Sequence, residues 1–324
     1  MQSNKEQQWF IALDGGGTRT RAAICNASGR IAAMSVGDAT NPLSRPWEAV
    51  ESTIRELVRD VIERAGIEKA LVSALYLGLA GADRPEIKDR LREAFTDEWG
   101  ERLLLDNDAV SALYAGTWGG PGIVLIAGTG SIAYTVTADE QRQRTGGWGY
   151  LIGDEGSGFD IGRRAAAAVM QAADGRGKPT ALTDLYLAHF GVNRPEELIA
   201  RIYGGINPRK ELADTSTLVE KAADLGDEVA TQIIAHAADD LVELVSASLR
   251  KVGSPLPVVL AGGLLTADTM LRREVLRRGR FAAKIPTVAP VIGALVAAMR
   301  RTGRHIDAEI ASRLEQSGTV RKKE

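Results

Sequence analysis

Three successive glycines in a short loop are the first feature of this sequence that could do chemistry. They belong to Asp14-Gly15-Gly16-Gly17-Thr18-Arg19-Thr20, which lies between two apolar runs. Without Cβ atoms, the glycines let backbone N–H groups approach a phosphate, the threonine hydroxyls add donors, and Asp14 can hold Mg²⁺ through water. A plain hairpin does not need three glycines in a row, because each costs backbone entropy. The stretch therefore predicts a phosphate-binding turn.

A second glycine turn, Gly128-Thr129-Gly130-Ser131, continues to Ala133 and matches the G-x-G-x-x-A form of a dinucleotide fingerprint. That fingerprint needs a helix directly after the glycines, whereas residues 131–137 are β-branched and alternating, as in a strand. The sequence also lacks a G-x-x-x-x-G-K-[ST] motif, so neither a Rossmann nor a P-loop site is expected. The remaining interpretation is a second phosphate-binding hairpin, facing the first across a cleft and gripping a nucleoside triphosphate.

Two aspartates, Asp106 and Asp108, lie where an apolar strand runs into a helix. Strand periodicity puts both carboxylates on one side. A carboxylate that faces a cleft from a strand end can accept a hydroxyl proton while the oxygen attacks phosphorus. A simple N-cap of the following helix is the structural alternative for Asp108.

Glycines also frame an aromatic and acidic segment at 146–158, GGWGYLIGDEGSG. Trp148 offers a flat apolar surface to a sugar ring, and Asp154 and Glu155 can accept hydrogen bonds from vicinal hydroxyls. Alternatively, Trp148 is a core residue and the two carboxylates form the acidic first turn of a helix. Another glycine pair, Gly262-Gly263, ends a buried strand and by itself is equally typical of a strand-to-helix turn.

Hydrophobic periodicity indicates the elements that must position these residues. In the first half it predicts the order βββαβαβα, at 9–14, 20–25, 30–36, 47–65, 74–79, 85–95, 102–105 and 108–115. A second half opens with strands at 123–127 and 131–137 and is more helical, with a strand at 257–261 and helices at 159–174, 180–190, 195–202, 215–224, 227–251 and 290–302. We therefore expect an N-terminal lobe over 1–116, a C-terminal lobe over 117–304 and a charged tail over 305–324. The closing helix can pack back on the first lobe.

Composition narrows the class of protein. The chain has 324 residues, 44% hydrophobic and 25% charged, with a formal net charge of -2, so it is globular and nucleic acid is not an expected partner. Cys25 is the only cysteine, which excludes an intrachain disulfide and fits a reducing compartment. The first eight residues are polar and no run of about 20 apolar residues follows. A cytoplasmic protein without a membrane span is predicted.

Taken in order, DGGGTRT, NDA, AGTGS, GGWGYLIGDEGSG and AGG resemble the N-acetylglucosamine kinase family and the related ATPases that activate benzoyl-CoA reductase (BadF/BadG/BcrA/BcrD type). The resemblance spans roughly residues 9–300. It implies an α/β fold of the two-lobed actin-like ATPase type, a duplicated ribonuclease H-like unit with an interlobe cleft. It also implies that 14–20 is the first phosphate motif, 127–131 the second, and 260–263, with Gly262 and Gly263, the adenosine motif.

The same resemblance makes Asp108, the aspartate of the T/N-D-A motif, the catalytic base. It implies amino-sugar contacts at Asn41, Asp108, Thr129, Ser131, Gly147, Trp148 and Asp154. Family kinases often carry asparagine after the serine of the second motif, and this chain has Ile132 there. The implied reaction is phosphorylation of an amino sugar by MgATP in a homodimer, foremost N-acetylglucosamine to its 6-phosphate. Glucosamine and N-acetylmuramic acid are the alternative substrates.

Two other functions are compatible with the fold. Activator ATPases hold an iron–sulfur cluster between subunits with two cysteines per chain, whereas Cys25 stands alone in an early strand. A sugar-sensing repressor normally adds a DNA-binding module, and the first motif already begins at residue 14. The kinase is therefore the favoured function.

Overall fold

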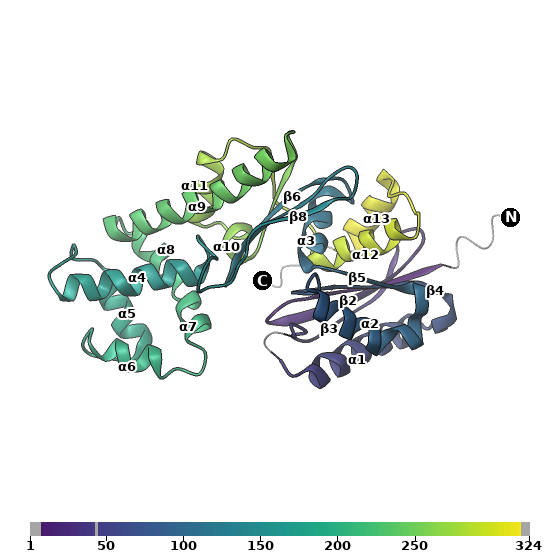
Figure 1. The fold of residues 1–324 in the computed structure, drawn as a ribbon, viewed down its shortest axis with the longest axis horizontal. Helices are drawn as coiled ribbons and strands as arrows, with labels where there is room; N and C mark the ends of the chain where they lie inside the picture. Colours follow the sequence, from purple (N-terminus) through teal and green to yellow (C-terminus); the bar gives the residue numbers. More distant parts are fainter. Residues whose placement is uncertain (1–7, 43–44, 319–324) are drawn as a thin grey trace. The chain divides into compact units, whose positions relative to one another are not determined.

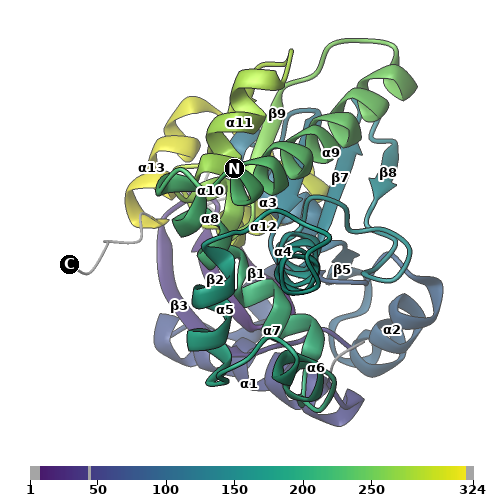
Figure 2. The ribbon, with the colours of Figure 1, turned by 90° about the vertical axis from the view of Figure 1, so that its left-hand side faces the viewer.

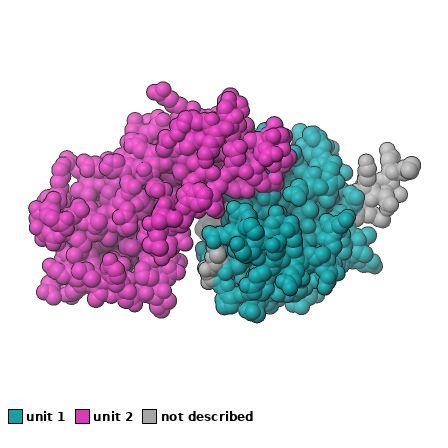
Figure 3. All heavy atoms as spheres, viewed as in Figure 1, with its two compact units in different colours: residues 1–122, 286–324 teal, residues 123–285 magenta. Residues whose placement is uncertain are grey.

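The computed structural model describes residues 8–42 and 45–318, and its internal contacts divide the chain into two compact units. Unit 1 comprises residues 1–122 and 286–324, and unit 2 comprises residues 123–285 (Figure 3). Each unit is built on one five-stranded sheet with helices packed against it (Figure 1). Most of the polar N-terminal stretch and residues 319–324 of the expected charged tail lie outside the described residues.

The sheet of unit 1 has the strand order β3-β2-β1-β4-β5. Its strands are β1 (Trp9–Gly15), β2 (Arg19–Asn26), β3 (Ile31–Asp38), β4 (Val72–Leu79) and β5 (Leu103–Asp106). The first three form an antiparallel meander, while β4 runs parallel to β1 and β5 parallel to β4. The register pairs Asp14 with Gly78 and Gly78 with Asp106, so the carboxyl ends of the three parallel strands are level.

Helices cover both faces of this sheet (Figure 1). They are α1 (Trp47–Ala65) and α2 (Pro85–Trp99) on one face, and α3 (Asp108–Thr117) and α12 (Pro290–Arg301) on the other, with α13 (Ala308–Gly318) beyond α12. In α1 the buried residues Val50, Ile54, Leu57 and Val61 recur at helical spacing, and Gly66 ends the helix with a φ of 65°. These buried residues belong to a hydrophobic core on this face of the sheet.

Helix α12 belongs to unit 1, although the sequence assigned 117–304 to the second lobe. It packs on α3 and on β1, and Gly293 permits the contact, because a Cβ there would lie 1.9 Å from the carbonyl oxygen of Ser111. The expected division is therefore corrected: residues 286–304 return to the first unit. The segment expected as a charged tail also forms a helix, α13, up to Gly318.

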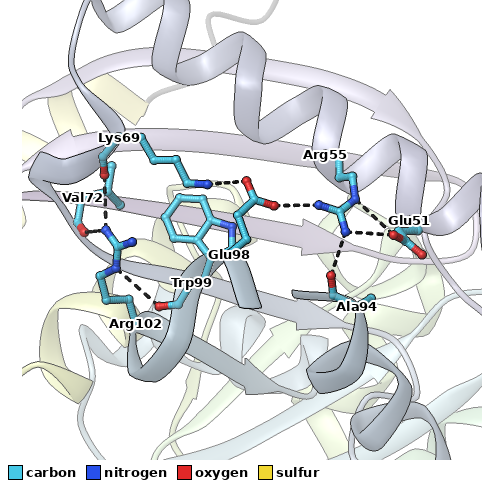
Figure 4. Close-up of polar contacts among 8 residues, drawn as sticks. All are labelled: Glu51, Arg55, Lys69, Val72, Ala94, Glu98, Trp99 and Arg102. Carbon is cyan, nitrogen blue, oxygen red and sulfur yellow. Dashed lines mark hydrogen bonds and ion pairs between the residues drawn. The ribbon is translucent and has the colours of Figure 1, made fainter. Parts of the chain in front are cut away.

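Ion pairs and cation–π contacts join α1 to α2 at the outer surface of unit 1 (Figure 4). Glu98 on α2 accepts from Arg55 on α1 at 2.6 Å and from Lys69, which lies in the short helix η1 (Lys69–Leu71). Lys69 and Arg102 both lie over the ring of Trp99, and Arg102 donates to the Val72 carbonyl at 3.0 Å. Such exposed pairs contribute about 0–1 kcal/mol each. They connect the two helices at the surface of the unit.

Unit 2 repeats the topology of unit 1, which confirms the expected duplication. Its sheet has the order β10-β9-β6-β7-β8, formed by β6 (Gly122–Ala127), β7 (Ser131–Val136), β8 (Arg142–Gly146), β9 (Val258–Ala261) and β10 (Ala283–Lys284). As in unit 1, consecutive strands form a meander, and the two later strands run parallel to the first. The sequence did not predict β8 and β10, because both are short and polar.

Unit 2 is more helical than unit 1 because helices are inserted between β8 and β9. They are α4 (Gly158–Ala173), α5 (Leu182–Phe190), α6 (Glu197–Tyr203), α7 (Pro208–Asp214), α8 (Ser216–Asp224) and α9 (Glu228–Val252), and α10 (Gly263–Thr266) and α11 (Met270–Arg278) follow β9. Figure 2 shows α9 crossing the sheet, where it packs on β7 and β8. Across the described residues, no helix is long and apolar enough to span a bilayer.

Candidate functional site

Polar residues of unit 1 gather where its parallel strands end. Asp14 is the penultimate residue of β1, Asp83 follows β4, and Asp108 follows β5. The carboxyl ends of neighbouring parallel strands lie at one edge of a sheet, which is where α/β folds commonly bind ligands. Here Asp83 acts electrostatically on Asp108, and Asp108 on Asp14. The topology therefore brings together two aspartates that the sequence selected and a third, Asp83, that it did not.

The first glycine turn is fixed by the segment that follows β3. The hydroxyl oxygens of Thr20 and Thr40 form a buried hydrogen bond of 2.9 Å, and a Cβ on Gly15 would lie only 2.0 Å from Thr40 Oγ1. Gly15 is thus required by packing. A Cβ on Gly16 would meet nothing within 4 Å, and Gly17 is exposed, so the backbone of these two glycines is open to a ligand.

Asn41, a predicted sugar contact, lies beside the first glycine turn. Its Nδ2 atom is 4.0 Å from the position that a Cβ on Gly17 would take. The predicted phosphate-binding turn and an amide that can hydrogen-bond hydroxyl or acetyl oxygens are therefore neighbours within unit 1.

Asn107, and not Asp108, caps helix α3. Its Oδ1 accepts from the backbone N–H of Ala109 at 2.9 Å, and its Nδ2 donates to Asp83 at 2.9 Å. Asp108 is the first residue of the helix, so the N-cap alternative for this residue is wrong. Asp106 is buried, accepts from the Asn107 N–H at 3.0 Å and lies 3.8 Å from Arg301. Its surroundings are those of a structural residue, whereas the Asp108 side chain is only half-buried at the same edge of the sheet.

Burial raises the pKa of Asp108 to about 7; the charge of Asp83 adds to this rise, while the Ala109 N–H opposes it. Burial and the charge of Asp108 likewise raise the pKa of Asp14 to about 7, and Arg21 lowers it. A general base works best when its pKa is near the working pH. The Asp14–Asp108 pair is also one that a divalent cation would stabilise, because it concentrates negative charge in a poorly solvated place.

The raised pKa of Asp14 predicts how stability depends on pH in the nucleotide-free protein. The folded carboxyl keeps its proton up to its pKa of about 7, whereas the usual pKa of an aspartate in the unfolded chain is 3.8. Its stabilising contribution is therefore present below pH 3.8 and lost as the pH rises to about 7. Asp14→Asn removes this loss. In urea unfolding, the variant should gain stability relative to wild type across this window, reaching about 1–2 kcal/mol at pH 8.

Asp89→Asn is the matched control, since the Asp89 side chain is 71% exposed. Its stability difference from wild type should stay flat over the same range of pH. A flat difference for Asp14→Asn as well would contradict the prediction.

The second glycine turn in unit 2 lies against the start of α4. Gly128 N–H donates to the Gly130 carbonyl at 2.9 Å, and Gly158 N–H donates to the Gly128 carbonyl at 2.8 Å. Ser131 is buried and its hydroxyl donates to the Glu155 carbonyl at 2.7 Å, so this predicted sugar contact also ties the turn to the segment before α4.

The glycine pair at the end of β9 adjoins the second turn. Strands β6 and β9 are parallel neighbours, with Ile126 opposite Ala261. Gly262 has a φ of 83°, and a Cβ there would lie 2.2 Å from the Ala127 carbonyl oxygen. Only glycine meets both conditions, whereas a Cβ on Gly263 would meet nothing within 4 Å. The two predicted nucleotide motifs of unit 2 therefore meet at the end of β6.

The segment 146–158 forms an irregular loop before α4. Trp148 is 62% exposed, so the core interpretation of this residue is wrong. Asp154 is buried with a left-handed φ of 59°, and helix α4 is capped by Ser157, so Asp154 and Glu155 precede the helix and do not form its acidic first turn. The side chain of Ile132 packs against Gly147, because a Cβ on that glycine would lie 2.8 Å from its Cδ1 atom.

Four residues with roles in these arrangements escaped the sequence analysis: Thr40, Asp83, Asn107 and Arg209, whose Nη2 atom lies 3.1 Å from Asp154 Oδ2. The asparagine had a local signal, since Asn is a preferred N-cap and stands directly before the helix. The other three act through partners distant in sequence, and nothing local marks them.

Two units of one topology, with glycine turns at the ends of parallel strands, define the actin-like ATPase class of fold. The chain belongs to the BadF/BadG/BcrA/BcrD ATPase family, whose pattern matches residues 11–298. ATP is therefore its nucleotide.

Relatives of the chain include named sugar kinases. It is 33% identical over 275 residues to the N-acetylmuramic acid/N-acetylglucosamine kinase of Clostridium acetobutylicum, covering 82% of this chain and 89% of the relative. It is 32% identical to the N-acetyl-D-glucosamine kinase of Dictyostelium discoideum, covering 78% and 84%. A crystal structure from Chromobacterium violaceum, assigned as an N-acetylglucosamine kinase, superposes with a TM-score of 0.74 at 31% identity, covering 90% of this chain and 99% of that one.

Proposed function

We propose that this protein is an ATP-dependent kinase of amino sugars, with N-acetylglucosamine phosphorylated on its 6-hydroxyl as the foremost substrate. The observation that carries the proposal is Asp108, a carboxylate at the end of β5 whose pKa of about 7 suits proton acceptance, in the same unit as an open glycine turn. The relatives named as N-acetylglucosamine kinases support the sugar class.

In the proposed reaction, Asp108 accepts the proton of the sugar hydroxyl as its oxygen attacks the γ-phosphorus of ATP, and the bond from that phosphorus to the bridging oxygen breaks to release ADP. The backbone N–H groups of residues 15–20 and 128–130 contact the phosphates, helped by Thr18, Arg19, Thr20 and Thr129, and Gly262 and Gly263 contact the adenosine. Catalysis in this class rests on positioning and electrostatic stabilisation, so rigid turns such as the one tied down at Gly15 are suited to it.

Mg²⁺ fits the unit 1 site as a partner of the nucleotide. Within the described residues, no group of three or more His, Cys, Asp or Glu is placed to hold a metal, so the chain alone offers no complete coordination sphere. Mg²⁺ commonly keeps several waters and binds through one or two carboxylates and substrate phosphates. Asp14 would hold it through water, and the bound ion would neutralise charge on the phosphates.

Asn41, Asp108, Thr129, Ser131, Gly147, Trp148 and Asp154 are the proposed contacts of the sugar. Because Ile132 stands where family kinases often have asparagine, glucosamine and N-acetylmuramic acid remain alternative substrates. The activator function is disfavoured, because the Cys25 thiol is buried on β2 and burial raises its pKa, which disfavours the thiolate that ligates iron. We place the enzyme in the cytoplasm, where ATP is available, as a homodimer.

A coupled ADP-release assay tests the proposal over a panel of N-acetylglucosamine, glucosamine, N-acetylmuramic acid and glucose. We expect N-acetylglucosamine to have the highest kcat/KM and glucose a value lower by at least about tenfold, the size of one lost polar contact. ³¹P NMR of the product identifies the phosphorylated hydroxyl. Equal turnover of glucose and N-acetylglucosamine would count against the proposal.

A further inference from the structure

The carboxylate of Asp154 is held by donors from three separate segments of unit 2. The backbone N–H groups of Gly149 and Ser131 bind it, and Arg209 Nη2 lies 3.1 Å from its Oδ2 atom. Asp154 is 4% exposed, whereas the Arg209 side chain is 41% exposed. The buried carboxylate thus has a cationic partner, Arg209, which reaches it from the solvent side.

Arg209 comes from helix α7, far from both glycine motifs in sequence. Its guanidinium lies over the ring of Tyr150, 5.3 Å from the centroid. A Cβ on Gly130 would lie 3.1 Å from Arg209 Nη2 and 2.9 Å from Asp154 Oδ2, so the ion pair packs directly against the second glycine turn. One side chain therefore joins α7, the aromatic segment and the second turn.

The placement of Arg209 is specific. Helix α7 begins with Pro208, and Asn207 caps it by accepting from the Lys210 N–H at 3.1 Å. Among the described residues, the buried Nε of Arg209 has no hydrogen-bond partner, so the Nη2 contact with Asp154 is what orients the guanidinium. Asp154 has a left-handed φ of 59°, a conformation that persists when the surrounding contacts enforce it.

We propose that Arg209 is a positioning residue for the sugar: it holds the Asp154 carboxylate in the orientation in which its remaining lone pairs accept substrate hydroxyls. This inference rests on the proposed function, because it takes Asp154 as a sugar contact. Arg209 acts through Asp154 and does not itself take part in phosphoryl transfer.

Electrostatics supports this role. Burial raises the pKa of Asp154, and the charge of Glu155 adds to this rise. The guanidinium of Arg209 is the strongest influence that lowers the pKa, and the backbone N–H groups of Gly149 and Ser131 lower it further. Without the guanidinium, Asp154 becomes protonated at a higher pH. A protonated carboxyl loses acceptor capacity, so sugar binding should weaken as the pH falls.

Steady-state kinetics of Arg209→Met and Arg209→Lys test the proposal. Arg209→Met should raise the KM for N-acetylglucosamine by about tenfold at pH 7, the size of a lost hydrogen bond to a charged group. The increase should be larger at pH 6 than at pH 8.5, while kcat and the KM for ATP change by less than about threefold. Arg209→Lys keeps the positive charge but loses the planar guanidinium that lies over Tyr150, so its KM should rise clearly less than that of Arg209→Met.

A KM increase that does not depend on pH, or equal impairment in the two variants, would overturn the proposal in favour of a purely structural role. A selective rise in the KM for ATP would overturn it too, by assigning Arg209 to the phosphates. If the wild-type protein phosphorylates none of the panel sugars, the proposed function fails separately. The coupling of Arg209 to Asp154 is then tested by thermal unfolding of Arg209→Met alone and of the double variant that also carries Asp154→Asn. A difference in stability between these two proteins that grows with pH supports the coupling, and a difference that does not change with pH overturns it.

Discussion

Replacing Asp108 with asparagine should lower kcat by about 10²–10⁴-fold with sugar and ATP saturating, the usual contribution of a positioned base. The amide keeps the shape of the carboxyl but cannot accept the proton. Helix α3 keeps its cap, because Asn107 provides it. Stability should not fall, since burial disfavours the charged carboxylate that the substitution removes. Nucleotide affinity, measured by calorimetry, should change little, because the proposed phosphate contacts come from the glycine turns.

Asp106→Asn is the matched control two residues away. Asp106 is buried and binds the Asn107 N–H, and an asparagine side-chain oxygen can still accept that hydrogen bond. We expect kcat within about threefold of wild type and a small loss of stability from the weakened contact with Arg301. Near-normal turnover in Asp108→Asn, or abolished turnover in Asp106→Asn alone, would remove Asp108 from its assigned role.

Among the substitutions considered in unit 2, Gly262→Ala should cause the largest loss of stability and of ATP affinity. A Cβ at this position would lie 2.2 Å from the Ala127 carbonyl oxygen, and the backbone φ of 83° is strained for alanine. The clash must displace either β9 or the second glycine turn at the end of β6. We expect a destabilisation of about 3 kcal/mol or more, together with at least tenfold weaker ATP binding in the folded fraction.

Gly263→Ala provides the comparison within the same motif. A Cβ there would meet nothing within 4 Å, and the residue is exposed at the start of α10. Its thermal unfolding temperature should match that of wild type within a few degrees. If both alanine variants behaved alike, the close approach at Gly262 would not be the cause of the effect.

The sequence predicted the fold well where hydrophobic periodicity is strong. Helix α1 was expected at 47–65 and lies at Trp47–Ala65, because its buried residues follow a regular helical spacing. Helix α7 and strands β8 and β10 were missed, because they are short and polar and depend on neighbours distant in the chain. The second lobe was expected to end at residue 304, whereas α12 belongs to unit 1, and the expectation that the closing helix packs back on the first lobe is confirmed. The bounds were missed because the sheet that a helix covers depends on long-range packing, here the contact of Gly293 with α3.

For the site, local sequence identified the glycine turns and the acidic positions but not their partners. Asn107 and Asp108 are both good capping residues, so only the backbone separates their roles: Asn107 has the extended φ and ψ of an N-cap, whereas Asp108 is the first residue of the helix. Thr40 lies 20 residues from Thr20, and Arg209 lies 55 residues from Asp154. Such pairings follow from tertiary packing, which no local pattern encodes.

Because α12 packs in unit 1, the two units become complete during synthesis in an order that differs from their order in the sequence. Residues 123–285 form one continuous unit, whereas the unit that contains β1 lacks α12 until residue 301 has been made. Domains fold during synthesis as their residues emerge from the ribosome. Unit 2, which is second in sequence, is therefore the first unit whose residues are all available. Until α12 has been synthesised, the apolar surfaces of β1 and α3 that it covers stay exposed in the growing chain.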